Sequence, residues 1–140
     1  MKKNKGFTLV ELLAVITVIG IVLSIATTAT VTIMNRGRKK SEMISAKDYV
    51  TAVNDYNVIA DKTDRLTTTN CDCVTMSTNL IRCNVQTTNG VSNKIKESLS
   101  GSLPKSGTVD INTTTYKVVS ARLKIKKYTV TYENSKYSVR

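Results

Sequence analysis

The sequence contains no histidine and no tryptophan, and it has only one phenylalanine and one proline. The absence of histidine removes the commonest general base and metal ligand of enzymes. No nucleophile–base pair, metal-ligand cluster or phosphate-binding loop can be recognised among the remaining residues. These absences argue against an enzyme and against a cofactor. Charge is also absent from Leu12 to Asn35, and this uncharged stretch is the dominant feature of the chain.

The uncharged stretch belongs to an apolar segment, residues 7–35, that is interrupted only by Glu11. A helix needs ~20 apolar residues to cross a bilayer, so this segment is long enough to span one. Three lysines and then Gly6 precede it. A carboxylate in a membrane helix costs up to roughly 3 kcal/mol at the centre and less near an end. Glu11 therefore requires a partner.

The string Lys-Gly-Phe-Thr-Leu-Val-Glu-Leu-Leu at residues 5–13 closely resembles the N-terminal motif of type IV prepilins and pseudopilins. The resemblance implies that a prepilin peptidase and methylase in the membrane cuts between Gly6 and Phe7. It then methylates the new N-terminal amine of Phe7. Glu11 matches the family's assembly glutamate, and Gly20 matches a glycine common in the family's helix. The implied partners are identical or related subunits, the cytoplasmic membrane, and an assembly platform with its ATPase.

Two partners for the Glu11 carboxylate stay open. In the family, the glutamate neutralises the cationic amine of a neighbouring subunit, because an unpaired charge is costly in a low dielectric. Phe7 and Glu11 are also four residues apart, so the amine of the same chain lies within reach across one helical turn. The carboxylate is favoured in either case by the positive end of the helix dipole.

The location of the chain follows from the resemblance and not from the loop charges. Lys2, Lys3 and Lys5 precede the apolar segment, whereas Arg36, Arg38, Lys39 and Lys40 follow it, so the positive-inside rule does not assign an orientation. The family implies a single-pass cytoplasmic membrane precursor that moves to an extracellular filament or to a periplasmic or cell-wall pseudopilus. An ordinary signal peptide cut near Thr27-Thr28-Ala29 is the rival interpretation, but apolar residues continue beyond that site.

We expect three parts: a leader at 1–6, a transmembrane and assembly helix at 7–35, and residues 36–140 as a helix continuation with a small globular head. Residues 41–62 repeat apolar or small positions at helical spacing: Met43, Ala46, Val50, Val53, Asn57 and Ala60. The helix is therefore predicted to continue through Gly37 to about Asp61 and to pack its second half on the head.

The rest of the chain predicts an α+β fold. Residues 62–90 are rich in Thr, Asn and Ser and have the composition of a loop, with Leu80-Ile81 touching the core. Residues 91–101 predict a small helix capped by Ser92 or Asn93. From Thr108 onward the apolar residues alternate, including Tyr116 with Val118, which predicts three or four antiparallel strands and a hairpin turn at 133–136. The order of a long helix, a loop and an antiparallel sheet resembles the pilin fold.

The three cysteines are Cys71, Cys73 and Cys83. An exported domain meets an oxidising compartment, so we expect one disulfide. Cys71 and Cys73 are too close in sequence for an easy bridge, and Cys83 can pair with either. Such a bridge contributes ~3 kcal/mol in the loop-entropy model. A metal site of these thiols without histidine is the weaker alternative.

The net charge is +11, and it becomes +8 once residues 1–6 are removed. Residues 116–140 hold seven Lys and Arg residues and one acid. Arg122, Lys124 and Lys126 alternate with apolar residues, which places them on one sheet face, and Lys127 can extend it. This face fits an anionic partner, with DNA first. A solvated outer face, or contacts to acidic residues of the next subunit, is the favoured explanation.

Taken together, these features predict a structural subunit of a type IV pilus-like filament. A pseudopilin of a type II secretion or DNA-uptake machine is the first alternative, since these machines use the same leader. A minor subunit that binds DNA through its basic sheet is the second. The third is a membrane-anchored protein that does not polymerise.

Overall fold

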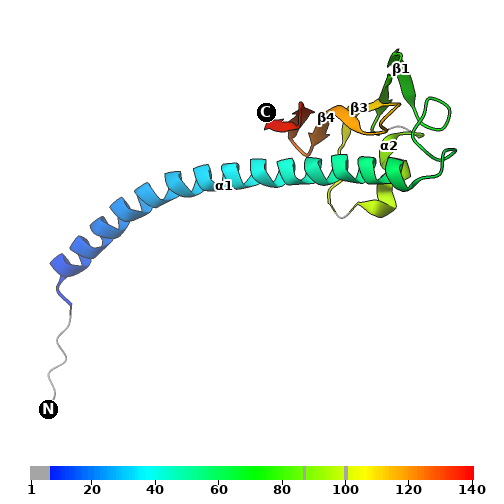
Figure 1. Cartoon of the computed structure of the whole chain (residues 1–140). Coiled ribbons are helices and arrows are strands. Elements are labelled where there is room, and N and C mark those ends of the chain that lie inside the picture. The colour runs from blue at the N-terminus through cyan, green and yellow to red at the C-terminus, as the bar shows by residue number, and fades with distance from the viewer. Residues whose placement is uncertain (1–6, 87, 100) are drawn as a thin grey trace. The chain divides into compact units, whose positions relative to one another are not determined.

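The computed structural model describes residues 7–86, 88–99 and 101–140, without the side chains of residues 26–29. Along the chain the elements are α1 (Leu9–Ile59), β1 (Cys73–Ser77), β2 (Leu80–Asn84), α2 (Val91–Ile95), the 3-10 helix η1 (Lys96–Ser98), β3 (Ser106–Asn112), β4 (Val118–Ile125), β5 (Tyr128–Glu133) and β6 (Lys136–Val139) (Figure 1). The chain divides into two units, Met1–Arg38 and Lys39–Arg140, which are described separately.

Helix α1 is continuous through Gly37, as predicted, and its ends lie within two residues of the expected ones. In the first unit, every described side chain from Phe7 to Arg38 is exposed. The large apolar side chains of this part are between 49% exposed, at Ile19, and 85% exposed, at Phe7. The helix is long and apolar enough to cross a membrane, with a mean hydropathy of 2.7 over 18 residues. Its apolar surface has no partner among the described residues of the chain.

The second unit begins with the rest of α1, and here one stripe of the helix is buried. Ala46, Tyr49, Val50, Val53 and Asn57 are at most 2% exposed. All of these except the polar Asn57 belong to the same hydrophobic core as the inner residues of the sheet. The predicted stripe on residues 43–60 is therefore present and packs on the sheet, which gives the α+β, pilin-like arrangement expected from the sequence.

Two asparagines of α1 fix the helix to its surroundings by hydrogen bonds. The Asn54 side-chain oxygen accepts a hydrogen bond from the backbone N–H of Val118 at 2.8 Å, which joins α1 to the start of β4. The side-chain oxygen of the buried Asn57 accepts one from the backbone N–H of Leu66 at 3.0 Å. Because buried backbone donors are costly to leave unpaired, these side chains help to set the register between helix and head.

The sheet has six antiparallel strands in the order β1-β2-β3-β4-β5-β6. The three or four strands predicted from Thr108 onward are present as the four strands β3 to β6. The sequence missed β1 and β2, which form within the segment that we expected to be a loop. Strand β1 lies at an edge and is mostly exposed on both faces, so its sequence shows no alternation. Strand β2 buries Ile81 and Cys83. The expected contact of Ile81 with the core is therefore confirmed.

Several connections adopt left-handed backbone conformations. Tyr116, predicted to lie in a strand, has φ 59° and closes the turn before β4. Asn134 and Ser135, at φ 50° and 62°, form the predicted hairpin turn. Gly107, at φ 147° in β3, lies so close to β4 that a Cβ atom there would collide with the backbone oxygen of Arg122. Only glycine fits at this position.

The small helix is shorter than predicted, and its expected cap is absent. Helix α2 ends at Ile95, and η1 continues it to Ser98. Gly90 is the N-cap residue and makes no side-chain cap bond. Ser92 is instead buried, and its hydroxyl lies 3.1 Å from the Tyr49 hydroxyl in a hydrogen bond. This bond joins α2 to the buried stripe of α1.

Candidate processing and assembly site

The start of α1 is closed by a reciprocal pair of bonds between Thr8 and Glu11. Glu11 Oε2 accepts hydrogen bonds from the backbone N–H and from the hydroxyl of Thr8, both at 2.9 Å. The Thr8 hydroxyl in turn accepts a bond from the backbone N–H of Glu11 at 3.3 Å. This is a capping box, in which Thr8 is the cap and Glu11 is the third helical residue. The Thr-x-x-Glu spacing was the signal for it, and the sequence interpretation missed it.

The capping box leaves Glu11 in a specific state. Both bonds go to Oε2, and Oε1 accepts no hydrogen bond from the residues that the structure describes. The bonds come from neutral groups, so they orient the carboxylate without cancelling its charge. Phe7 lies just outside the helix and is fully accessible, at 85% exposure. Gly6, the other residue of the expected cleavage site, lies outside the described residues.

The cysteines lie in the head. Cys73 and Cys83 are directly opposite each other on β1 and β2 and form a disulfide. Of the two pairings open to Cys83, this is the one present. Cys71 is a buried free thiol, and its burial raises the pKa of the thiol above the ordinary value. In the described part of the chain, no group of three or more Cys, Asp or Glu side chains is arranged to hold a metal ion.

The basic residues of the C-terminal strands fall into two groups. Arg122 and Lys124 are exposed on the outer face of β4. Lys126 is not on that face, because it occupies the turn between β4 and β5 at φ 51°, with its Nζ 2.9 Å from Oε1 of Glu42. Lys127 follows in the same turn, with its Nζ 5.2 Å from the centre of the Tyr128 ring. The single basic face expected from the sequence is therefore divided between the sheet and the turn.

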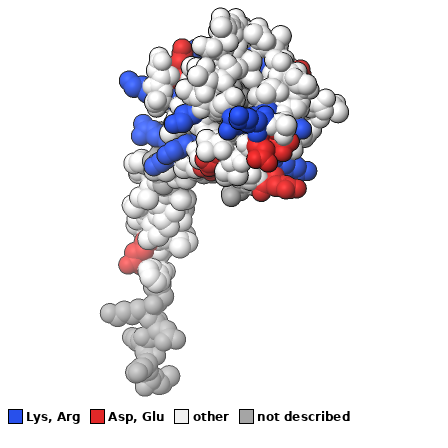
Figure 2. Space-filling view, turned by 45° about the vertical axis from the view of Figure 1, so that its right-hand side comes forward, with Lys and Arg blue, Asp and Glu red and all other residues white. Residues whose placement is uncertain are grey.

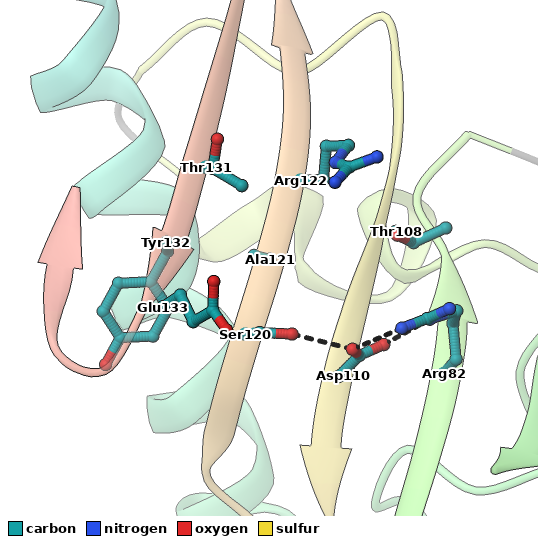
Figure 3. Close-up of a pocket in the computed structure, with 9 residues that line it drawn as sticks. All are labelled: Arg82, Thr108, Asp110, Ser120, Ala121, Arg122, Thr131, Tyr132 and Glu133. Carbon is teal, nitrogen blue, oxygen red and sulfur yellow. Dashed lines mark hydrogen bonds and ion pairs between the residues drawn. The ribbon is translucent and has the colours of Figure 1, made fainter. Parts of the chain in front are cut away.

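A polar pocket of about 260 Å³ lies on the outer face of the sheet (Figure 3). Arg82 binds Asp110 through two hydrogen bonds, of 2.6 and 2.7 Å. Ser120 donates a third hydrogen bond to Asp110, at 2.7 Å. The Arg82 guanidinium, with help from Ser120, holds the pKa of the Asp110 carboxyl below its usual value. Figure 3 shows that Arg122 reaches toward the same pocket from β4.

This cluster was not foreseen from the sequence, because Arg82 and Asp110 are 28 residues apart. The register of the sheet brings them together, since Arg82 pairs with Asp110 and Asp110 pairs with Ser120 across three adjacent strands. The bonds of Asp110 are directed at its own neighbours in the sheet. We therefore assign a structural role to this cluster, and Arg122 and Glu133 are exposed residues of the pocket.

The N-terminal geometry agrees with a comparison of the sequence with known families. Residues 1–27 match the model of the prokaryotic N-terminal methylation motif. No curated protein and no solved structure gives a significant match to the chain. The matched segment contains Gly6, Phe7, Thr8 and Glu11, so it covers the residues that the resemblance singled out.

The motif, the long apolar helix and the α+β head agree with one class of protein. They support the resemblance to the type IV prepilins and pseudopilins, which are structural subunits. The motif implies processing by a prepilin peptidase and assembly with other pilin subunits. With the apolar helix, it also indicates a membrane-anchored precursor.

Proposed function

We propose that this protein is a structural subunit of a type IV pilus-like filament, cut between Gly6 and Phe7 and assembled through the first part of α1. The observation that supports this proposal is the exposed apolar surface of residues 7–25 and 30–34, with Glu11 near its start and one oxygen of that carboxylate available. In a monomer this surface can be covered by lipid. In a filament, the same surface can be covered by the helices of other copies.

Glu11 supplies the specific contact of the proposed assembly. Cleavage would create a cationic amine on Phe7, at the edge of an apolar segment. The Oε1 atom of a neighbouring subunit's Glu11 can accept a hydrogen bond from that amine. Its Oε2 atom meanwhile keeps its hydrogen bonds from Thr8 in the capping box. The charge pair forms where water is scarce, so the loss of one partner costs ~3 to 5 kcal/mol by analogy with buried pairs.

Pairing within one chain is the competing arrangement. The hydrogen bonds that Glu11 makes inside its own chain come from Thr8 and leave Oε1 available to an amine of either chain. Pseudopilins of type II secretion and DNA-uptake machines are processed and assembled through the same kind of helix. Our proposal therefore concerns the step that these machines share, which is the addition of a processed subunit to a filament.

Two variants test the role of Glu11. Glu11→Gln removes the charge but keeps a side chain that can serve in a capping box. Thr8→Ala removes the cap, at a cost of ~1 kcal/mol, but keeps the charge. We expect the processed Glu11→Gln protein to be present in the membrane and to form no filaments, whereas Thr8→Ala forms filaments at reduced yield. Electron microscopy measures filament yield, and mass spectrometry of the same samples checks for a methylated Phe7 N-terminus.

The result can contradict the proposal in two ways. Normal filaments from processed Glu11→Gln protein would exclude pairing between chains. Equal loss of filaments in both variants would show that the helix cap matters and the charge does not. If the unchanged protein forms no filaments with its assembly machinery present, the anchored, non-polymerising interpretation is correct.

A further inference from the structure

The basic residues that follow the apolar segment are not explained by filament assembly. Four of them occur within five residues: Arg36, Arg38, Lys39 and Lys40. Basic residues next to a membrane helix are typical of the cytoplasmic side. With the leader in the cytoplasm, these residues lie on the opposite side of the membrane. They therefore require a source of negative charge outside.

The structure adds a second basic group to the beginning of the head. Lys126, in the β4–β5 turn, pairs with Glu42 of α1 at 2.9 Å. Glu42 is two residues beyond Lys40 and only 3% exposed. This contact places the turn, with Lys127 and the nearby Lys124, beside the same part of α1 as Lys39 and Lys40. Residues from two distant parts of the sequence thus meet in one unit.

We call this group the basal lysines: Lys39, Lys40, Lys124, Lys126 and Lys127. All five side chains are exposed, and Lys126 keeps 62% of its side chain accessible despite its ion pair. Glu42 is buried and paired with Lys126, so it contributes little negative charge to the surface. Figure 2 shows several Lys and Arg side chains along the left side of the head, and others at its centre and right with acidic side chains beside them.

An aromatic residue, Tyr128, lies next to the basal lysines and bears on what they contact. The Lys127 ammonium lies 5.2 Å from the centre of the Tyr128 ring, and Tyr128 is partly exposed. Tyrosine is enriched where a membrane meets water, because its ring is apolar and its hydroxyl is polar. A turn with exposed lysines beside a half-buried tyrosine has the composition of a surface that contacts lipid headgroups.

We infer that, before assembly, the basal lysines dock the head onto anionic phospholipid headgroups. These headgroups belong to the outer leaflet of the membrane that the anchor spans. This inference rests on the membrane anchor in the proposed function. Met34 is the last residue of the large apolar run at the start of α1. Lys39 follows it by five residues, a separation of ~8 Å along a helix. This distance is about one Debye length at physiological salt, so the attraction between lipid phosphates and the lysines is reduced by salt but not abolished.

The apolar helix that anchors the chain in the membrane favours lipid over other anions as the partner of the basal lysines. The anchor holds the basal lysines at a high effective concentration relative to the headgroups. DNA or an acidic protein must reach them from solution. A membrane surface needs only the turn and the nearby helix.

The absence of tryptophan gives a clean reporter for this docking. The full-length mature protein with Tyr128→Trp is placed in vesicles of phosphatidylcholine alone, or of phosphatidylcholine with phosphatidylglycerol. Headgroup-labelled lipid then quenches the tryptophan if the turn touches the surface. We expect quenching in the phosphatidylglycerol vesicles at low salt, and its loss at high salt. A reporter at Tyr116→Trp, beyond the opposite end of β4, should stay unquenched in both.

Matched charge variants identify the residues. Lys124→Gln with Lys127→Gln should weaken docking about 25-fold, because each lysine near an anionic surface contributes about five-fold. Lys94→Gln with Lys96→Gln, in α2 and η1, makes the same charge change and should leave docking intact. Lys126 is left unchanged so that Glu42 keeps its partner. Equal losses in the two double variants would overturn the inference, since net charge alone would then explain docking.

Further measurements distinguish a failure of this inference from a failure of the proposed function. They also distinguish lipid from other anions as the partner of the lysines. Vesicle flotation reports the anchor: a protein that does not float contradicts the membrane anchor and the docking together. A protein that floats without quenching contradicts the docking alone. If duplex DNA binds the protein without vesicles more tightly than phosphatidylglycerol vesicles dock it, and Lys124→Gln with Lys127→Gln removes that binding, the assignment to lipid is wrong.

Discussion

The two halves of α1 are built from one continuous helix but meet opposite conditions. In residues 7–38 every described side chain is exposed, although most of them are apolar. In residues 39–59 the apolar positions are fewer, yet Tyr49 and Val53 are completely buried. The second half finds its partner in the sheet of its own chain. The first half finds none among the described residues.

This difference separates folding from assembly. Burial of an apolar side chain contributes about 1.5 to 3 kcal/mol, so the stripe on the second half stabilises the head directly. The first half can gain the same energy only from lipid or from other copies of the chain. A continuous apolar surface of this extent marks an interaction site and not a tolerated patch. Substitutions in the two halves should therefore be detected by different measurements.

The strongest test of this separation unfolds the head and leaves the anchor in place. Gly107→Ala forces a Cβ atom into the backbone of Arg122 at a φ that disfavours side chains. We expect it to lower the free energy of unfolding of the head by ~4 kcal/mol or more. Thermal unfolding followed by near-ultraviolet circular dichroism measures the loss, and membrane fractionation should still find the protein in the membrane.

Gly101→Ala is the control for this change. A Cβ at Gly101 would meet its nearest neighbour, Asp48 Oδ2, at 3.8 Å, an ordinary contact. The head should therefore remain folded. If Gly107→Ala has no larger effect than Gly101→Ala, the close approach of β3 and β4 is not as described.

A matched pair of Val→Ala substitutions, one in each half of α1, compares the two halves. We expect a smaller change in the free energy of unfolding than for Gly107→Ala. Val53→Ala removes two buried methyl groups and should destabilise the head by about 2 to 3 kcal/mol. Val22→Ala, at a residue that is 59% exposed in the first half, should change the free energy of unfolding of the head by less than about 0.5 kcal/mol. Chemical denaturation of the detergent-solubilised protein measures both. Similar losses would mean that the two halves unfold as one unit.

A smaller effect concerns pH and is confined to the head. The pKa of Asp110 is lowered by Arg82, so the carboxylate stabilises the folded state above the ordinary aspartate pKa. That contribution should be lost as the pH falls through the lowered value. Asp110→Asn should cost about 1.5 kcal/mol at neutral pH, and the difference from the unchanged protein should shrink toward pH 2.

The measurement is the free energy of unfolding between neutral pH and pH 2. Asp61→Asn, at an exposed residue, is the control and should change stability by less than about 0.5 kcal/mol. A constant difference between Asp110→Asn and the unchanged protein across this range would show that the ion pair with Arg82 does not titrate as described.

Periodicity in the sequence predicted the parts of the fold in which a single rule dominates. The apolar segment predicted the exposed half of α1, and the spacing of Ala46, Val50 and Val53 predicted the buried stripe. Strand β1 was missed because an exposed edge strand has no inward face and so no alternating pattern. The capping box was also missed, although its signal is local and was present at Thr8 and Glu11.

Contacts between distant segments could not be predicted from the sequence. The pairing of Lys126 with Glu42 depends on a left-handed turn, which is uncommon for a lysine and has no local signal here. The Arg82–Asp110 pair depends on the register of β2 and β3. In both cases the sequence identified charged residues, and only the fold determined which of them are neutralised and which stay exposed.

The two oxygens of Glu11 bear on how easily such a filament comes apart. One oxygen is held by Thr8 within the subunit, and the other is free to meet an amine. In the proposed filament, a departing subunit would exchange its contact with a neighbouring chain for lipid. It would keep the capping box of Thr8 and Glu11, so the start of its helix would stay ordered without refolding.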